Sequence, residues 1–411
     1  MIYSSKELME PNTIRKIDYW FGQPICFLLT LFRSGPPTGK SKPKKIIFLK
    51  FIEQGATVLA YSALNRATEI VGKENVYFCV FENNRPILDI LEVIPQENVI
   101  VLREKSLGSF LNSSLAALVK IRRLKIDTAI DMEFFSRASA IFSFMSGAKT
   151  RVGLHRFTSE LPYRGNLMTH RIQYNPYMHT SVSYRFLVEA ALEDPSEVPM
   201  LKIPSSDLEK KVREGLAVFI PSERERKEMA EKLDTLFGKK PEKIVILNPN
   251  AGDMLPLRKW EAEKFIVLGK KIISENENIR IVISGAPSEQ KDAEEICRQI
   301  GSVKAVSFAG KTSLRELLTL YSLSHILVTN DSGPGHFSSL TKIRTIILFG
   351  PETPKLFGPI SPNAHVIWKE LACSPCVSVF NHRFSTCNNN NSCMKSITVD
   401  EVYSAVKNLL N

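Results

Sequence analysis

The chain is 411 residues long, which exceeds what one hydrophobic core normally supports, so at least two domains are expected. With 44% hydrophobic and 24% charged residues, its composition excludes a disordered chain, a collagen-like repeat and a disulfide-rich mini-protein. The formal net charge is +11, and the first fifty residues carry nine basic and three acidic side chains, so more than half of the excess lies there. Charge concentrated in an N-terminal arm predicts an anionic partner for that arm.

Residues 1–43 are expected to form a membrane-interface arm followed by a linker. The apolar run from Tyr19 to Phe32 spans fourteen residues and contains Pro24, whereas a helix that crosses a bilayer needs about twenty. We therefore expect this run to lie in an interface rather than to cross one. No small-x-small cleavage site follows it, and the seven cysteines show no secretory spacing. These features predict a cytoplasmic protein, associated peripherally with the inner face of the cytoplasmic membrane.

Residues 44–193 alternate between short apolar runs and helical patterns, which predicts a first α/β domain. Short apolar strands between helices are typical of a parallel sheet that is covered on both faces. The stretch 150–177 is rich in Arg, His, Tyr and Asn and is expected to be a functional loop region. Strands are expected at 45–51, 76–81, 99–102 and 128–132, and helices at 56–71, 110–123, 136–144 and 179–192.

Residues 194–241 contain five prolines and predict an interdomain connection with one charged helix. The alternation restarts over residues 242–411, which predicts a second α/β domain. Capping boxes are expected at Ser313 with Glu316 and at Thr398 with Glu401. Strands are expected at 243–247, 280–284, 303–308, 326–329 and 345–348, and helices near Trp260, Ser288 and Ser313. Two open α/β halves normally bind ligands at the carboxyl ends of their strands.

The strongest motif is the run VTNDSGPGH that ends at His336, between an expected strand and an expected helix. Gly333 and Gly335 allow the backbone to approach a ligand closely, and the free amides of a first helical turn attract an anion such as a diphosphate. Asp331 can accept hydrogen bonds from ligand hydroxyls, and His336 can donate to a phosphate oxygen. The alternative interpretation is an ordinary glycine-rich turn with a capping aspartate.

Together with other elements in the same order, this motif resembles the C-terminal half of glycosyltransferase family 9, the ADP-heptose:lipopolysaccharide heptosyltransferases. The resemblance covers about residues 44–410, strongly in the second half and weakly in the divergent first half. The other elements are LNPNAG at 247–252, RKW at 258–260, SGAPSE at 284–289, AGKTS at 309–313, TIILFGP at 345–351 and FGP at 357–359. An ordered set of loops is far more specific than any one motif.

The resemblance implies a GT-B architecture, with two Rossmann-like domains and a cleft between them. In this reading 44–193 binds the acceptor, 242–411 binds the donor, and the final helix returns to the hinge. It also implies an inverting transfer of heptose, or of a related sugar, from a nucleotide sugar, with ADP-heptose as the expected donor and no metal or cofactor required. The expected acceptor is an anionic lipopolysaccharide-core-like or other lipid-linked envelope glycan.

By position, the resemblance assigns roles to side chains in the donor loops. Glu289 is expected to bind the ribose, Thr312 the adenine side, and Arg258 or Lys259 the leaving phosphate, where a cation can stabilise developing charge. A solvated helix entrance is the alternative for that basic pair. The complete donor set is Asn250, Arg258, Lys259, Glu289, Thr312, Asn330, Asp331, Ser332, Gly333, Gly335 and His336.

The turn after the first strand departs from the family. In relatives it usually ends Gly-Asp, and that aspartate is the expected general base, whereas here Ala56 occupies the position. A base needs a carboxylate or histidine near the acceptor hydroxyl. Glu53, in the same turn, is the first candidate, because a longer side chain could reach the same place. Asp131 and Glu133, at another strand end, are the others. Glu53 could equally be an exposed turn residue, and Asp131 could cap the next helix.

Two further groups have less specific patterns. The basic, aromatic stretch with Arg151, His155 and Arg164 suits an anionic acceptor, and a solvated loop is the alternative. Four cysteines near the C-terminus lack the two closely spaced pairs of a zinc ribbon, so reduced thiols are expected rather than a metal or disulfide. They are Cys373, Cys376, Cys387 and Cys393.

A membrane-peripheral glycosyltransferase is the leading functional hypothesis. A transferase or epimerase with a soluble substrate would not need the apolar arm. A non-catalytic nucleotide-sugar-binding relative would explain Ala56. Nucleic acid is not an expected partner, because the basic excess lies beside an apolar run and not on a nucleic-acid-binding module.

Overall fold

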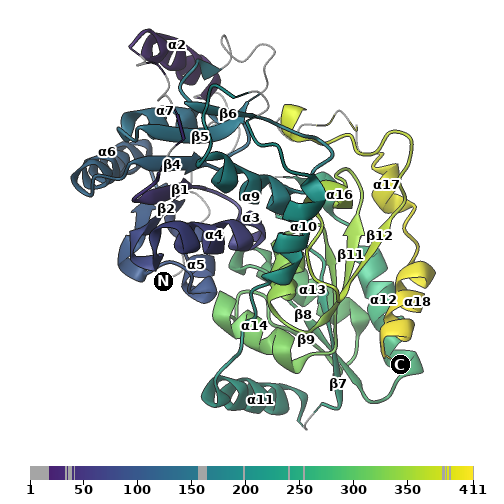
Figure 1. Cartoon of the computed structure of the whole chain (residues 1–411). Helices are drawn as coiled ribbons and strands as arrows, with labels where there is room; N and C mark the ends of the chain where they lie inside the picture. Colours follow the sequence, from purple (N-terminus) through teal and green to yellow (C-terminus); the bar gives the residue numbers. More distant parts are fainter. Residues whose placement is uncertain are drawn as a thin grey trace. The chain divides into compact units, whose positions relative to one another are not determined.

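The computed structural model contains two compact α/β units, Met1–Leu216 and Ala217–Asn411. Figure 1 shows the chain coloured along its sequence. The structure describes residues 18–410 except 33–34, 36–38, 41, 156–163, 198–199, 239–240, 253–254, 382–384, 386 and 388–389. Each unit is built around one parallel six-stranded sheet.

The first sheet has the order β3-β2-β1-β4-β5-β6, and all of its neighbouring strands are parallel. Its strands are β1 (Ile46–Leu49), β2 (Val76–Phe81), β3 (Val99–Leu102), β4 (Thr128–Asp131), β5 (Thr150–His155) and β6 (His170–Gln173). The register pairs Leu49 of β1 with Asp131 of β4. The residues that follow these two central strands therefore meet at one edge of the sheet.

Helices cover both faces of the first sheet. One face buries α6 (Leu107–Arg123) and α7 (Arg137–Met145) through a core that includes Leu118, Ile121 and Phe142. Figure 1 shows α4 (Tyr61–Val71) and α9 (Thr180–Ala190) on the other side of this sheet. Within the described residues the unit also contains α2 (Gln23–Leu31), α3 (Gln54–Leu59), α5 (Pro86–Leu91) and α10 (Ser205–Glu214).

The second sheet has the order β12-β11-β10-β7-β8-β9 and is also parallel throughout. Its strands are β7 (Lys243–Asn248), β8 (Ile279–Ile283), β9 (Ala305–Ser307), β10 (Ile326–Asn330), β11 (Arg344–Phe349) and β12 (Ala364–Trp368). Strands β7 and β10 lie at its centre, flanked by β8 and β11. Their carboxyl-end loops therefore lie next to one another, which is where parallel sheets carry their ligand sites.

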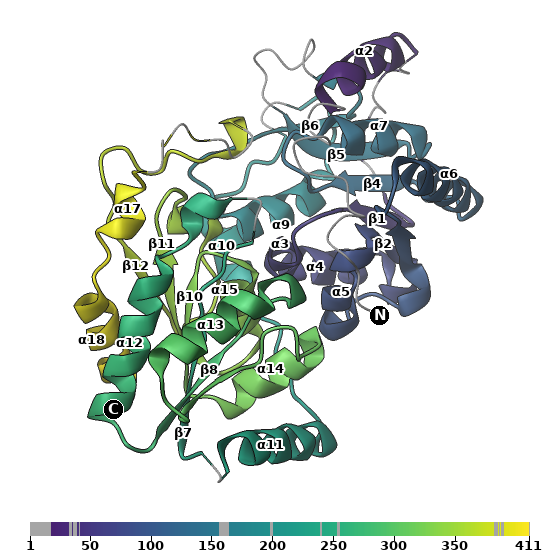
Figure 2. The same cartoon turned by 180° about the vertical axis from the view of Figure 1, so that it is seen from behind.

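Figure 2 shows α12, α13 and α14 of the second unit from behind. The helices are α11 (Glu223–Phe237), α12 (Ala262–Glu275), α13 (Gln290–Ile300), α14 (Leu314–Leu323), α15 (Gly333–Phe337), α16 (Pro354–Phe357), α17 (Ser392–Lys395) and α18 (Val399–Leu410). The final helix α18 packs against α12, β10 and β11 within this unit. The capping box of Ser313 and Glu316 is confirmed, and Thr398 accepts from Glu401 N.

The prediction of a loop over 150–177 is wrong where β5 and β6 form. Both strands contain buried polar side chains that form hydrogen bonds. A search for apolar runs therefore does not detect these strands. His170 of β6, for example, is fully buried between Thr169 Oγ1 at 2.9 Å and Glu193 O at 3.1 Å. Residues 194–241 also hold two helices, α10 and α11, rather than one. Strand β12 was not predicted.

The apolar run near the N-terminus forms a short π-helical turn, Asp18–Gly22, followed by α2. Cys26 fixes α2 to the first unit, because it is buried with Ala140, Leu167 and Met168. Most other large side chains of the run face outward; they include Tyr19, Trp20, Phe21, Phe27, Leu28, Leu31 and Phe32. Among the described residues, no helix combines the length and the apolar character needed to cross a bilayer.

Candidate active site

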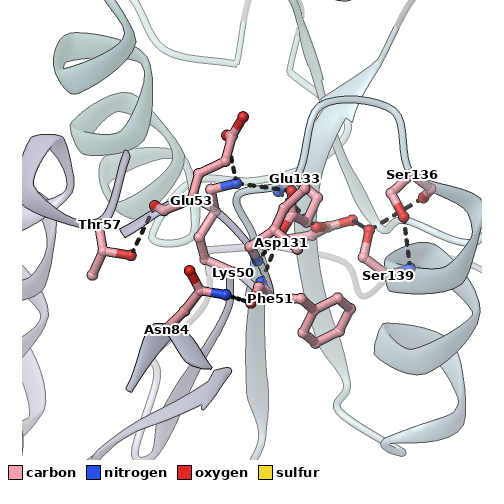
Figure 3. Close-up of polar contacts among 10 residues, drawn as sticks. Lys50, Phe51, Glu53, Thr57, Asn84, Asp131, Glu133, Ser136 and Ser139 are labelled. Carbon is pink, nitrogen blue, oxygen red and sulfur yellow. Dashed lines mark hydrogen bonds and ion pairs between the residues drawn. The ribbon is translucent and has the colours of Figure 1, made fainter. Parts of the chain in front are cut away.

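In the first unit, a charged cluster forms where β1 and β4 end. Figure 3 shows Lys50 Nζ between the carboxylates of Glu53 and Glu133. The Lys50 ammonium is fully buried and donates to Glu133 Oε2 at 2.9 Å and to Glu53 Oε2 at 3.2 Å. A buried cation is tolerated only when it is paired in this way. Because β1 and β4 are parallel neighbours, Lys50 and Glu133 come together at the ends of these strands although they are far apart in the sequence.

Glu133 is engaged on both of its carboxylate oxygens. Oε1 accepts from Phe51 N at 2.6 Å and from Ile52 N at 3.3 Å, and Oε2 accepts from Lys50. The side chain is 8% exposed. Glu133 therefore fixes the turn after β1, and its geometry suits a structural anion better than a base.

Asp131 is fully buried at the end of β4. Its Oδ2 accepts from Ser139 Oγ at 2.8 Å, and its Oδ1 accepts from Glu133 N at 3.0 Å. Burial raises the pKa of this carboxyl to about 7, and the positive charge of Arg164 opposes that shift. The N-cap of α7 is Ser136, which accepts from Ser139 N, so Asp131 supports the helix start without capping it.

Glu53 is the most exposed of the three acidic candidates, with 18% of its side chain accessible. Its backbone has φ 72° and ψ 83°, a left-handed conformation that residues with a Cβ rarely adopt. Glu53 lies at the N-cap of α3, and its carbonyl accepts from Thr57 N at 3.2 Å. Ala56, at the family's aspartate position, lies inside α3. The strained turn thus presents a glutamate at the end of β1.

The basic acceptor candidates are buried rather than displayed on a loop. Arg151 donates to Leu167 O and Ala148 O, both at 2.7 Å, and so ties β5 to its neighbouring segments. Arg164 donates to Leu154 O and lies with Nη1 3.9 Å from Asp131 Oδ2. Burial, together with nearby arginines, lowers the pKa of His155 to about 4. His155, in its neutral form, lines a small hollow, and Arg164 lines the same hollow.

In the second unit, the predicted donor residues lie at or after the carboxyl ends of β7, β8, β9 and β10, with Asn330 as the last residue of β10 and Gly333, Gly335 and His336 in α15. Asn330 connects two of these loops. Its Oδ1 accepts from Trp260 N at 3.0 Å, and its Nδ2 donates to Pro249 O at 2.8 Å. Ser332 Oγ donates to Asn330 O at 3.1 Å. The side chains of Asn330 and Ser332 therefore stabilise these loops through hydrogen bonds to backbone groups.

Arg258 lies among acidic side chains in the donor loops. Its Nη1 is 3.3 Å from Glu352 Oε2 and 4.0 Å from Asp331 Oδ2, and its Nη2 donates to Ala251 O at 3.3 Å. Asp331 and Glu352 are both buried. Burial raises the pKa of both carboxyls, the negative charge of Asp331 raises the pKa of Glu352 further, and the positive charge of Arg258 opposes both shifts. One cation thus faces two buried acids that favour a shared proton.

Glu352 was missed by the sequence reasoning. It follows β11 in the segment GPETP, and β11 pairs with β10, whose end carries Asp331. An acidic residue directly after a strand that neighbours the motif strand is the signal that could have found it. The buried polar atoms Asn250 Nδ2 and Arg258 Nε have no hydrogen-bond partner among the described residues. Unused buried donors are costly, so their presence at these loops indicates a ligand with acceptor oxygens.

The other donor candidates lie around this cluster. Glu289 Oε2 accepts from Ala286 N at 2.7 Å and starts the turn before α13. Thr312 directly precedes the N-cap of α14, and Lys259 is half-buried next to Arg258. A Cβ on Gly335 would lie 3.6 Å from Ile347 and Thr329, an ordinary contact. His336 is half-buried in α15, and Gly333 begins that helix.

The four C-terminal cysteines are free thiols, and Cys376 Sγ lies 3.2 Å from Ser385 Oγ. No cluster of three or more His, Cys, Asp or Glu suited to a metal occurs within the part of the chain that the structure describes.

Two units that each contain a parallel sheet with charged loops at its strand ends are typical of the GT-B fold, and solved structures share this fold. E. coli ADP-heptose lps heptosyltransferase II aligns with a TM-score of 0.64 at 18% identity, over 89% of this chain and 98% of that one. A glycosyl transferase family 9 structure from Veillonella parvula aligns with a TM-score of 0.65 at 19% identity, over 90% and 99%. The expected fold class is confirmed.

Comparison of sequences identifies the family to which the chain belongs. The sequence profile of glycosyltransferase family 9 (heptosyltransferase) matches residues 115–383, so the chain belongs to this family and is a glycosyltransferase. It is 25% identical over 311 residues to lipooligosaccharide heptosyltransferase 2 of Campylobacter jejuni subsp. jejuni serotype O:6, covering 73% of this chain and 84% of that protein. The profile match begins after β1, so Glu53 and Ala56 lie in the divergent part.

Proposed function

We propose that this enzyme transfers heptose, or a related sugar, from ADP-heptose to a lipid-linked, lipopolysaccharide-core-like glycan, with inversion at the anomeric carbon. Family membership and relatives named lipopolysaccharide or lipooligosaccharide heptosyltransferase 2 support the sugar and the acceptor class. The observation that carries the proposal is the donor cluster. There a single arginine, two buried acids and an unused amide donor meet at adjacent strand ends.

In the donor loops, Arg258 is the group that stabilises the leaving diphosphate. In an inverting displacement the bond from the anomeric carbon to the phosphate oxygen breaks as the acceptor oxygen attacks, and the electron pair leaves with ADP. Arg258 Nε and Asn250 Nδ2 have no hydrogen-bond partner among the described residues, so both can donate to the phosphate oxygens as negative charge develops there. Asp331 and Glu352 hold the guanidinium in place and can accept hydrogen bonds from sugar hydroxyls when ionised.

In the first unit, Glu53 is the proposed general base, which takes the proton of the acceptor hydroxyl as the new bond forms. Three observations support it over Asp131 and Glu133. Its carboxylate is the most exposed of the three, it lies in the turn where relatives carry their aspartate, and Lys50 holds it by one oxygen. Glu133 keeps Lys50 and the turn fixed, and Lys50 in turn holds Glu53 Oε2 at 3.2 Å.

The N-terminal arm is proposed to hold the enzyme at an anionic membrane surface, where a lipid-linked acceptor is found. Trp20 is 70% exposed, Phe21 65% and Phe32 77%. Aromatic and aliphatic side chains beside basic residues favour the interface between headgroups and acyl chains. Such placement explains why large apolar side chains on α2 face away from the unit that Cys26 packs against.

Calorimetric titration with ADP, GDP and UDP tests the donor site. We expect selective binding of ADP, and weaker binding of ADP-heptose by an Asp331→Ala variant because a partner for sugar hydroxyls is lost. The product formed from ADP-heptose and a lipopolysaccharide-core acceptor then tests the reaction. Inversion at the anomeric carbon, measured by NMR, is expected. Binding of no nucleotide, or a retained anomeric configuration, contradicts the proposal.

One observation favours a second candidate, a nucleotide-sugar-binding relative without transferase activity. The family resemblance implies an aspartate where this chain has Ala56, and Glu53 is the carboxylate that lies in the same turn. ADP-heptose binding without turnover on any acceptor, equal in the native chain and in Glu53→Gln, would select this candidate.

A further inference from the structure

Helix α6 has apolar side chains on the face that points away from the sheet. Leu107 is 48% exposed, Leu111 58%, Leu115 62% and Val119 39%. The four residues follow each other at intervals of four, so they form one row along about 18 Å of helix. The adjacent stripe of the helix is also apolar and packs into the core through Ala117, Leu118 and Ile121. The apolar arc of α6 is therefore wider than the part that faces the core, and such a helix normally has a second partner.

The charges around the row indicate the kind of partner. Residues 105–125 carry five basic and no acidic side chains. Lys120, Arg122 and Arg123 are exposed near the end of the helix, and within the described part of the chain none of them forms an ion pair with a carboxylate. Lys120 Nζ and Arg122 Nε donate only to backbone carbonyls. An apolar row beside unneutralised cations fits an anionic surface with an apolar interior.

The position of α6 agrees with that partner. Helix α7 contacts α2 on one side, and its Met145 O accepts from Arg122 of α6 at 3.0 Å. Figures 1 and 2 both show α2 and α6 on either side of α7. Helices α2 and α6 thus both contact α7 in the first unit. Leu115 and Val119 of the row share one exposed surface of α6 with Lys120 and Arg123.

We infer that the outward row of α6, with its basic last turn, is a second membrane-contact surface that binds anionic phospholipid headgroups and inserts Leu111 and Leu115 between them. The inference rests on the proposed function, in which the arm is the first contact. One weak interfacial element binds reversibly, and stable attachment takes two. A second copy of this chain is a poorer occupant, because pairing two α6 helices brings cations together without acids to neutralise them.

Vesicle flotation of the full chain tests the inference, with phosphatidylcholine vesicles that contain or lack phosphatidylglycerol. L111S/L115S should bind the anionic vesicles at least about tenfold more weakly. Val303→Ser, at a side chain that is 91% exposed in the second unit, is the apolar control. K120Q/R123Q should lose roughly ten- to thirtyfold at low salt and little at high salt. K211Q/R213Q, in the last turn of α10, is the matched charge control. All variants should keep the native affinity for ADP.

The arm variant W20S/F27S separates this inference from the proposed function. Losses in both the arm and the α6 variants, larger when they are combined, support the inference. Loss in W20S/F27S alone overturns the inference and leaves the proposed function standing. Unchanged binding in every variant overturns the inference and the membrane role proposed for the arm, but not the proposed transfer reaction, which nucleotide binding and product analysis test separately. A dimer of the native chain without vesicles, dispersed by L111S/L115S, also overturns the inference and assigns the row to a second copy.

Discussion

The two units carry charged clusters at the same edge of the same kind of sheet, but the clusters differ in how complete they are. In the first unit, Lys50 is fully buried and both of its partners are carboxylates within 3.2 Å. In the second, the Arg258 side chain is 16% exposed, its Nε lacks a partner among the described residues, and its acids have raised pKa values. A buried cation with carboxylate partners on the protein holds a loop in place. A cation with an N–H group that lacks a partner is suited to binding a ligand.

The largest effect is expected when Glu53, the member of the first cluster proposed as the general base, is replaced. Glu53→Gln should lower kcat about 10²–10⁴-fold, because the acceptor hydroxyl loses its base while the turn keeps its shape. Steady-state kinetics with ADP-heptose measure the change, and the affinity for ADP should stay constant. Glu92→Gln is the control, since Glu92 of the same unit also has a positive φ, 54°. Adding Ala56→Asp to Glu53→Gln should restore part of the rate. A native kcat in Glu53→Gln would exclude it as the base.

Glu133 tests whether the first cluster is a structural one. Glu133→Gln should lower the free energy of unfolding by about 3 kcal/mol, because it leaves buried Lys50 with one partner and two backbone amides with a neutral acceptor. Urea denaturation measures this loss. Glu69→Gln removes the exposed pair with Arg66 and should cost less than about 1 kcal/mol. Equal losses in the two variants would contradict a structural role for Glu133.

Arg258 tests the incomplete cluster. Arg258→Ala should weaken ADP binding about 10- to 100-fold, since a charge-assisted hydrogen bond is lost and two acids remain near the phosphates. Calorimetric titration gives the affinity, and Arg298→Ala on the exposed face of α13 is the control. If ADP bound the two variants equally, the donor phosphates would have to lie elsewhere.

The smallest effect is expected in the pH dependence of stability. Burial and the charge of Asp331 raise the pKa of Glu352 from 4.5 to about 8. Between these values the folded state holds more protons than the unfolded state, so the free energy of unfolding falls as pH rises through the window. Glu352→Gln should remove this decrease of the free energy of unfolding with rising pH. Urea denaturation at several pH values measures it, and an unchanged slope would exclude this titration.

The sequence predicted the donor loops well because each is a local motif that directly follows a strand. Asn330 and Asp331 lie next to each other in one run, and their strand has an apolar pattern. The first cluster was harder to predict, since Lys50 and Glu133 are 83 positions apart and meet only through the register of β1 and β4. Strands β5 and β6 were missed because Arg151 and His170 are buried with polar partners, which reverses the usual pattern.

The turn after β1 has a consequence for how such enzymes diverge. Its amides at Phe51 and Ile52 are held by Glu133 from another strand, so the shape of the turn depends little on which side chains it carries. Selection can therefore exchange residues within the turn without rebuilding the loop. The turn can thus carry a carboxylate at position 53, or one in place of Ala56, and still keep the two hydrogen bonds that hold its backbone.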